Sequence, residues 1–189
     1  MGMKATEQLK AEHDGIKLML RILEEICIGL ESGQDLNTEH LESIIEFFRI
    51  FADRCHHGKE EDLLFPALER AGIPKDGGPI GQMLLEHDEG RRYIRGMADA
   101  LARHKNGERS SSSEFVVNAR NYTNLLTNHI EKENSVLFRI ADQLLSPGKQ
   151  DKLLEEFENL EVNRIGKGKH EEFHRLLDEL ADVYLKLEG

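Results

Sequence analysis

The sequence predicts an all-α protein: an up-and-down antiparallel four-helix bundle with two additional C-terminal helices. Apolar residues recur every three or four positions along most of the chain, which is the spacing of helices with one buried face. No stretch of strand length alternates between apolar and polar residues. The composition, 39% hydrophobic and 32% charged, is typical of a folded protein, and 189 residues leave room for one substantial core. We expect residues 1–146 to form the bundle and residues 147–189 a helical extension packed on the same domain.

A polar stretch separates the first two predicted helices. The first is expected over residues 6–31, where one side is lined by Leu9, Ile16, Leu20, Leu23 and Cys27. Asn37 or Thr38 can cap the second, which extends to about residue 71 because a glycine and a proline follow. Pro66 falls inside this helix and lacks a backbone N–H, so a kink is expected near it.

The later helices are delimited by loops rich in Gly, Pro or Ser. The third is predicted over residues 80–105, after a loop with three glycines and two prolines. The fourth spans residues 114–145 and follows a serine-rich connection in which Ser111 and Glu114 have capping-box spacing. The dipeptide Ser146-Pro147 opens a fifth helix, and a glycine-containing stretch separates it from a sixth. The apolar stripe of the sixth consists of Phe173, Leu176, Leu177, Leu180, Tyr184 and Leu187.

Charge and apolar patterning limit the partners. The net charge of −11 makes nucleic acid and anionic membrane surfaces poor partners. No apolar run approaches the roughly 20 residues of a membrane span, and the N-terminus lacks the apolar region of a signal peptide. Cys27 and Cys55 form no spaced framework, and for Cys55 a buried, inert thiol is favoured over a redox role. We therefore expect a cytoplasmic protein whose oligomeric state is left open.

An internal repeat is the most informative feature of the chain. The strings HHGKEEDLLF (residues 56–65) and HIEKENSVLF (residues 129–138) align without a gap. The shared positions are His56 with His129, Lys59 with Lys132, Glu60 with Glu133, Leu64 with Leu137 and Phe65 with Phe138. Glu-His-Asp at residues 12–14 matches Glu-His-Asp at residues 86–88, so each helix pair supplies a lone histidine and then a His-x-x-x-Glu motif.

This pattern predicts a metal site. Residues four positions apart lie on one face of a helix, so each His-x-x-x-Glu pair can address one point. Antiparallel packing brings the two pairs and the two lone histidines together, and such a cluster is very costly in a core without a partner ion. Scattered polar residues on exposed faces are the alternative, but two matching copies favour metal binding. The candidate ligands are His13, His56, Glu60, His87, His129 and Glu133.

The neighbouring pair His57 and Glu61 has the same spacing, so local geometry alone does not choose between the registers. The repeat does choose, because His57 corresponds to Ile130 and Glu61 to Asn134. In an α-helix His57 points about 100° away from His56. We therefore expect His57 on the surface or behind the ligands, and Glu61 as a solvated carboxylate or an outer partner; whether His57 also binds metal is left open.

Over about residues 5–145 these motifs resemble the hemerythrin-like, or HHE cation-binding, family of four-helix bundles with a non-haem di-iron centre. The resemblance implies that Glu60 and Glu133 bridge two iron ions. It further implies that His13 and His56 bind one ion and that His87 and His129 bind the other. Oxygen-carrying hemerythrins have a fifth histidine one turn from the His87 equivalent. Here those positions hold Met83 and Arg91, which argues against a reversible oxygen carrier.

The ligand set of four imidazoles and two carboxylates bears on function. Thiolates are absent from it, which argues against iron–sulfur or structural zinc sites. We expect a protein with two iron ions that binds, senses or scavenges a small ligand such as oxygen, nitric oxide or peroxide. A sensor would need a separate protein partner. The alternatives are a stress-response enzyme that reduces nitric oxide or peroxide or supplies iron for iron–sulfur repair, and a divalent-cation storage module. Other divalent metals can replace iron in a recombinant sample.

For three further residues a structural role is favoured over a role in metal binding. His170 and His174 lie one turn apart, and a solvated face is favoured over a surface metal site. A minor alternative is that His170 folds back to supply the missing fifth ligand. Tyr122 lies seven residues before His129 on the same face, and a core aromatic with a hydrogen-bonded hydroxyl is favoured over a residue that lines the site.

Overall fold

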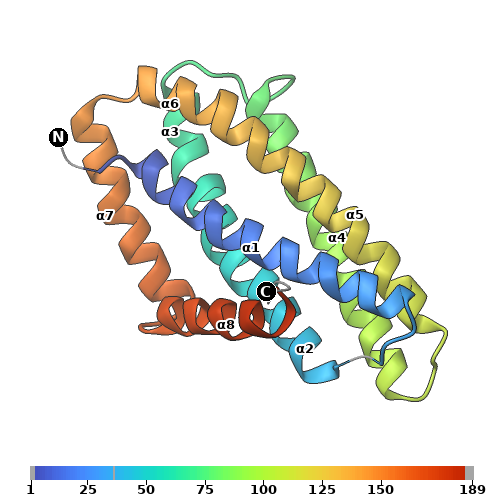
Figure 1. The fold of residues 1–189 in the computed structure, drawn as a ribbon. Coiled ribbons are helices and arrows are strands. Elements are labelled where there is room, and N and C mark those ends of the chain that lie inside the picture. Colours follow the sequence, from blue (N-terminus) through green and yellow to red (C-terminus); the bar gives the residue numbers. More distant parts are fainter. Residues whose placement is uncertain (1–2, 36, 186–189) are drawn as a thin grey trace.

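The computed structural model of the protein describes residues 3–35 and 37–185, and within these ranges the regular structure is entirely helical. Four helical rods form the bundle (Figure 1). The all-α prediction is confirmed. The first rod is α1 (Ala5–Glu31), and the third is α4 (Pro79–Lys105). The second rod consists of α2 (Thr38–Phe47), η1 (Phe48–His57), η2 (Glu60–Leu64) and α3 (Phe65–Arg70). The fourth consists of α5 (Ser111–Lys132), η3 (Glu133–Leu137) and α6 (Phe138–Leu144). The segments named η are π-helical.

Two further helices follow the bundle, α7 (Pro147–Arg164) and α8 (Lys169–Tyr184). Both pack against α1, and α7 also contacts η1 and η2. In Figure 1 they lie together on one side of the bundle, whereas α4 and α5 run side by side on the opposite side. Of the apolar stripe predicted for the last helix, Phe173, Leu177 and Leu180 are buried, and Leu187 lies outside the described residues.

The predicted ends of the helices agree with the structure to within a few residues, with one wrong cap. Asn37 caps α2, because its side-chain oxygen accepts a hydrogen bond from the His40 N–H at 3.1 Å. The capping box at Ser111 and Glu114 is not formed. Ser111 is instead the first residue of α5, its hydroxyl donates to the Glu108 carbonyl at 2.6 Å, and Glu114 pairs with Arg103.

The π-helical turns follow the internal repeat. Residues 60–64 in η2 correspond to residues 133–137 in η3, so the repeat is present in the backbone as well as in the side chains. Pro66 lies in the first turn of α3, where its missing N–H is least costly. Arg139 holds the equivalent place after η3, so proline is not required for the π turn. Single π turns inside helices are frequent at functional sites.

The apolar core is divided into two clusters. One contains Phe47, Phe48 and Tyr122, and the other contains Phe65 and Phe138. Along α1, Leu9 belongs to the second cluster and Ile16 to the first, with His13 between them. The bundle therefore has a polar layer between its two apolar clusters.

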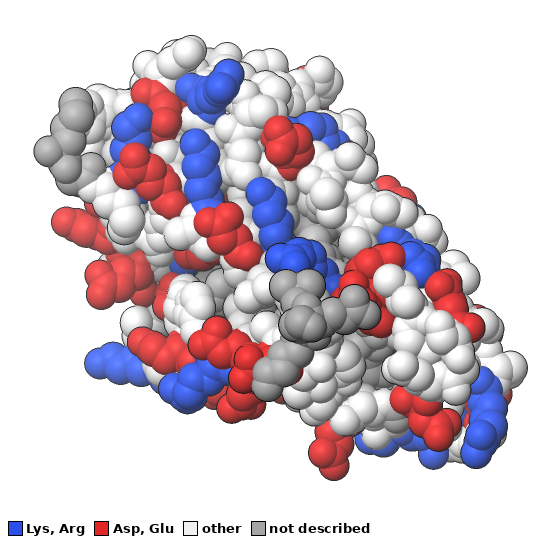
Figure 2. Space-filling view, viewed as in Figure 1, with Lys and Arg blue, Asp and Glu red and all other residues white. Residues whose placement is uncertain are grey.

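The cysteine prediction is confirmed: Cys27 and Cys55 are free and buried. Burial raises the pKa of each thiol to about 12, so the reactive thiolate is scarce at neutral pH. No helix in the described part of the chain is both long enough and apolar enough to cross a lipid bilayer. Acidic and basic side chains are interspersed over the face formed by α1, α7 and α8 (Figure 2).

Gly81 provides a test of the loop that precedes α4. A Cβ at this position would collide with the backbone carbonyl of Lys75, which a side-chain rotation cannot relieve. We expect Gly81→Ala to lower the free energy of unfolding by about 1–3 kcal/mol. Gly148→Ala, in the first turn of α7, places its methyl group in open space and should be neutral or stabilising by up to about 1 kcal/mol. Urea denaturation of both variants measures this, and equal stabilities would contradict the close approach of the loop to Gly81.

Candidate metal centre

The structure brings the six predicted ligands together in the polar layer. Each side chain is at most 1% exposed. The set consists of His13 from α1, His56 from η1, Glu60 from η2, His87 from α4, His129 from α5 and Glu133 from η3. Every rod of the bundle therefore contributes at least one member.

The four histidines converge in two pairs through their Nε2 atoms. The Nε2 atoms of His13 and His56 are 2.9 Å apart, and those of His87 and His129 are 3.1 Å apart. These are the two pairs that the family resemblance implies for two separate ions.

Each of the two glutamates faces both histidine pairs. The two oxygens of Glu60 lie 3.7 Å from His56 Nε2 and 3.5 Å from His87 Nε2. The two oxygens of Glu133 lie 3.2 Å from His13 Nε2 and 3.2 Å from His129 Nε2. A carboxylate that presents one oxygen to each pair is placed to bridge two ions.

The outer nitrogens of the four rings are held by acceptors. Glu12 lies 2.8 Å from His56 Nδ1, and Glu86 lies 2.9 Å from His129 Nδ1. The other two distances are 2.7 Å from His87 Nδ1 to Glu61 and 3.0 Å from His13 Nδ1 to Asn134 Oδ1. Because these oxygens accept hydrogen bonds, each ring in its neutral form keeps its proton on Nδ1 and turns the lone pair of Nε2 towards the centre.

The donor set fits a pair of metal ions. Four Nε2 atoms face one another in a buried space, together with four carboxylate oxygens that make no hydrogen bond with the described residues. Such an arrangement repels itself unless a cation lies between the donors. The potential ligand atoms form two groups that share Glu60, and within each group all the atoms lie within 4.8 Å of one another. The groups are His13, His56, Glu60 and Glu133, and His57, Glu60, His87 and His129.

The pKa values of the buried glutamates and histidines also show that these groups cannot all be charged together without a metal ion. Burial and the neighbouring Glu133 raise the pKa of Glu60 well above its usual value. Burial would also raise the pKa of Glu133, but His129 and His13 hold it well below the ordinary value. Burial and His13 lower the pKa of His56 to about 4. Burial would lower the pKa of His129, but Glu133 and Glu86 raise it to about 9. Without a metal ion, a proton on His129 therefore offsets the charge of Glu133, while Glu60 and His56 resist ionisation.

His57 differs from its predicted position. Of the two predicted positions, the one on the surface is wrong, because His57 is 4% exposed, and its ring stacks on that of His87 with centroids 3.8 Å apart. The residue ends the π-helical η1, whose wider turn rotates each residue by less than the 100° assumed for an α-helix. The side chain of His57 therefore points more nearly in the direction of His56 than an α-helix would allow, and it belongs to the ligand group that contains His87 and His129.

Arg91 occupies one of the two positions at which the family resemblance implies a fifth histidine. Its guanidinium donates to Glu61 at 2.6 Å and to Asp53 at 2.8 Å. Glu61 in turn accepts from His87, and Asp53 lies 3.5 Å from His57 Nδ1. Arg91 thus supports the two stacked rings from behind instead of supplying a ligand.

The repeated Leu-Phe that closes each string also has a place in the site. The Phe138 ring stacks on His13 with centroids 5.5 Å apart, and the Phe65 ring stacks on His87 at 6.0 Å. Each phenylalanine therefore covers the lone histidine of the other helix pair and helps to exclude water from the polar layer.

Several supporting residues were missed in the sequence, although the repeat contains them. Glu12 and Glu86 are the matched residues before the lone histidines, and Lys59 and Lys132 are the matched lysines. Lys59 Nζ lies 2.6 Å from Glu12, and Lys132 pairs with Glu86. Residues shared by both copies but unused as ligands were the signal that could have identified this outer shell.

The remaining candidates lie apart from the centre. His170 and His174 belong to neither ligand group; His170 Nδ1 lies 3.2 Å from Glu161 instead. Tyr122 is a core aromatic as expected, but its predicted hydrogen bond is wrong, because the hydroxyl has no partner among the described residues.

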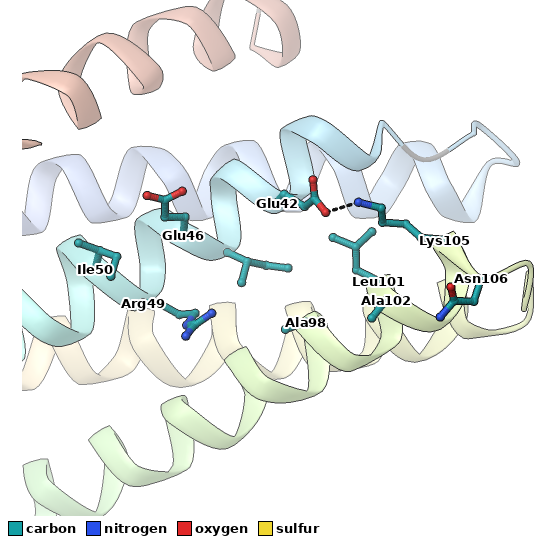
Figure 3. A pocket seen from close by; sticks show the side chains of 10 residues that line it. Glu42, Glu46, Arg49, Ile50, Ala98, Leu101, Ala102, Lys105 and Asn106 are labelled. Atoms are coloured by element: carbon teal, nitrogen blue, oxygen red, sulfur yellow. Dashed lines mark hydrogen bonds and ion pairs between the residues drawn. The ribbon is translucent and has the colours of Figure 1, made fainter.

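A surface groove of about 640 Å³ between α2, η1 and α4 is also separate from the centre. Its floor includes Ile45 and Leu101, which belong to the first apolar cluster, and the ion pair of Glu42 with Lys105 crosses it (Figure 3). None of the six ligand candidates lines this groove.

A four-helix bundle with a buried layer of paired histidines and shared glutamates defines a class of proteins, those that bind metal cations between their helices. The model of the hemerythrin HHE cation-binding domain matches residues 4–141, and the chain belongs to this family. Similar proteins from Mycobacterium bovis and Mycobacterium tuberculosis, both described as uncharacterised, are 24% identical over 179 residues. That alignment covers 95% of this chain and 68% of each relative. No solved structure matches the chain significantly.

Proposed function

We propose that this protein holds two non-haem iron ions and uses them to bind, sense or scavenge a small ligand such as oxygen, nitric oxide or peroxide. The observation that carries the proposal is that Glu60 and Glu133 each present one oxygen to each histidine pair. Two separate single-metal sites would not need either carboxylate to face both pairs.

The donor types accommodate iron, and the proposed reactions with oxygen, nitric oxide or peroxide are the reason for choosing iron among the ions that such a site can take. Imidazole and carboxylate suit iron, zinc, nickel and copper, and the two ligand groups contain no thiolate. The bound iron pair supplies open coordination positions and one-electron redox chemistry. The chain itself orients the Nε2 atoms through their outer acceptors and excludes water with the Phe65 and Phe138 rings.

His57 extends the proposed ligand set to five histidines. His57 shares a ligand group with His87 and His129, and its Nδ1 lies 3.5 Å from Asp53. We place it on the ion of that pair. The two ions then differ, with three histidines near one and two near the other.

Metal analysis tests the proposal directly. Protein purified with and without air should contain two iron ions per chain, and the oxidised form should absorb visible light where the metal-free form does not. Nitric oxide added to the anaerobically reduced protein should change this spectrum. One ion per chain, or ions that survive mutation of the six ligand candidates, would contradict the proposal. A two-ion protein whose spectrum ignores oxygen, nitric oxide and peroxide would favour cation storage.

The role of His57 can be separated from its packing. His57→Phe keeps an aromatic ring against His87 but removes the nitrogen donors. We expect it to weaken the binding of one ion by about 10-fold or more and to shift the visible spectrum, while the second ion is retained. The matched control is Ile130→Leu at the equivalent position of the repeat, which should leave both ions bound. Unchanged affinity and spectrum in His57→Phe would return His57 to a packing role.

A further inference from the structure

Lys59 is a buried lysine that the proposed ligand set does not use. Its side chain is 0% exposed, and a buried ammonium group is costly unless it is paired. The Nζ atom lies 2.6 Å from Glu12 on α1 and 2.8 Å from Glu161 on α7. Two carboxylates from different parts of the chain therefore hold this cation.

These contacts connect α7 to one histidine pair. Glu12 contacts Lys59 through Oε1, and its Oε2 accepts from His56 Nδ1 at 2.8 Å. The second oxygen of Glu161 lies 3.2 Å from His170 on α8. A continuous series of charged groups therefore runs from the two C-terminal helices to His56.

The internal repeat provides a built-in comparison. Lys132 is equivalent to Lys59 and pairs with Glu86, which accepts from His129 Nδ1 as Glu12 does from His56. However, the Lys132 side chain is 43% exposed, and Glu86 is its one ion-pair partner within the described residues. In both halves of the centre a lysine pairs with the glutamate that orients a histidine. The halves differ in that α7 covers Lys59, whereas Lys132 is open to solvent. The covering helix, α7, lies outside the residues that match the family model.

The outer end of the series is open to water. A groove of about 830 Å³ between α1, α7 and α8 is lined by Glu12, Glu158, Glu161 and His170, among others. Glu161 is 23% exposed in this groove, whereas Glu12 is 5% exposed. Solvent in the groove therefore reaches Glu161 more readily than Glu12, the carboxylate that orients His56.

We propose that Glu161 is a positioning residue for the metal site: by holding Lys59, it fixes Glu12 and the His56 ring and slows the loss of the ion bound by His13 and His56. The inference rests on the proposed function. The two ions should therefore be released at different rates, because on the side of His129 no described helix covers Lys132.

The release of Co²⁺ tests this inference. Protein loaded with two Co²⁺ ions is mixed with excess EDTA, and the visible absorption of the bound ions is followed with time. In Glu161→Gln one of the two ions should leave about 10-fold faster than in the wild type, and the other should leave at the wild-type rate. Glu158→Gln, an exposed carboxylate in the same groove, should behave as the wild type.

The lysines supply a second comparison. Lys59→Met should accelerate the release of one ion at least as much as Glu161→Gln, whereas Lys132→Met should change either rate by less than about fivefold. If the loss of Lys59 prevents folding, the comparison of Glu161→Gln with Glu158→Gln still tests the inference. Thermal unfolding of the metal-free variants controls for general destabilisation, and Glu161→Gln should match Glu158→Gln.

The outcomes separate this inference from the proposed function. Equal release from Glu161→Gln and Glu158→Gln, or equal acceleration of both ions in Glu161→Gln, would overturn the positioning role while the two-ion site stands. A wild-type protein that takes up no Co²⁺ would overturn the proposed function and this inference with it.

Discussion

Replacing Glu133 by alanine should reduce the metal content from two ions per chain to one or none. The two oxygens of Glu133 lie 3.2 Å from His13 Nε2 and 3.2 Å from His129 Nε2, so its loss removes a donor from both histidine pairs. The remaining carboxylate, Glu60, then has to balance the positive charge of two ions alone. Elemental analysis of the purified variant and a Co²⁺ titration measure the stoichiometry.

The matched control for this variant is Glu131→Ala. Glu131 lies two residues earlier on the same rod and is exposed, so its replacement should leave two ions bound. Glu60→Ala should reproduce Glu133→Ala, because the repeat gives Glu60 the same relation to His56 and His87. A Glu133→Ala protein that retains two ions with wild-type affinity would show that the carboxylate does not bridge them.

Removal of the metal should lower the melting temperature by about 10 °C or more. An ion present at about 1,000 times its dissociation constant stabilises the folded state by about 4 kcal/mol. For a chain of this size, each kcal/mol corresponds to about 2–4 °C in melting temperature. The chelated protein must also keep four inward-facing imidazoles and two carboxylates without a cation, and the raised pKa of Glu60 reflects that cost.

Differential scanning calorimetry before and after chelation, and again after iron is restored, measures this effect. The chelator should lower the melting temperature of Glu133→Ala by less than that of the wild type, since the variant holds fewer ions from the start. An unchanged melting curve after complete removal of metal from the wild type would indicate an exposed, incidental site instead of a buried centre.

The positions of the helices and the six ligand candidates could be predicted from local pattern. Helical hydrogen bonds join residues four apart, so the spacing of apolar residues and of His56 with Glu60 reports structure directly. The repeat then selected one register over its neighbour, since His57 and Glu61 have no matching residues in the second copy. The structure places all six candidates in one buried layer.

Two errors arose where the backbone departs from the assumed geometry. The surface position for His57 assumed an α-helical rotation, whereas η1 is π-helical up to that residue. The predicted helix over residues 114–145 begins three residues later than α5, so Ser111 lies inside the helix instead of capping it. Apolar spacing does not distinguish an α turn from a π turn, because the choice depends on how the rod packs against its neighbours.

By itself, the sequence determined the all-α class, the order of the helices and the repeated ligand motifs, because these depend on contacts between residues close in the chain. Only the tertiary structure decided which groups stand behind the ligands. Asn134 reaches His13, Glu61 reaches His87, and α7 covers Lys59 but leaves Lys132 exposed. These contacts join residues 26 to 121 positions apart, so they are fixed by the packing of whole rods, which no local spacing encodes.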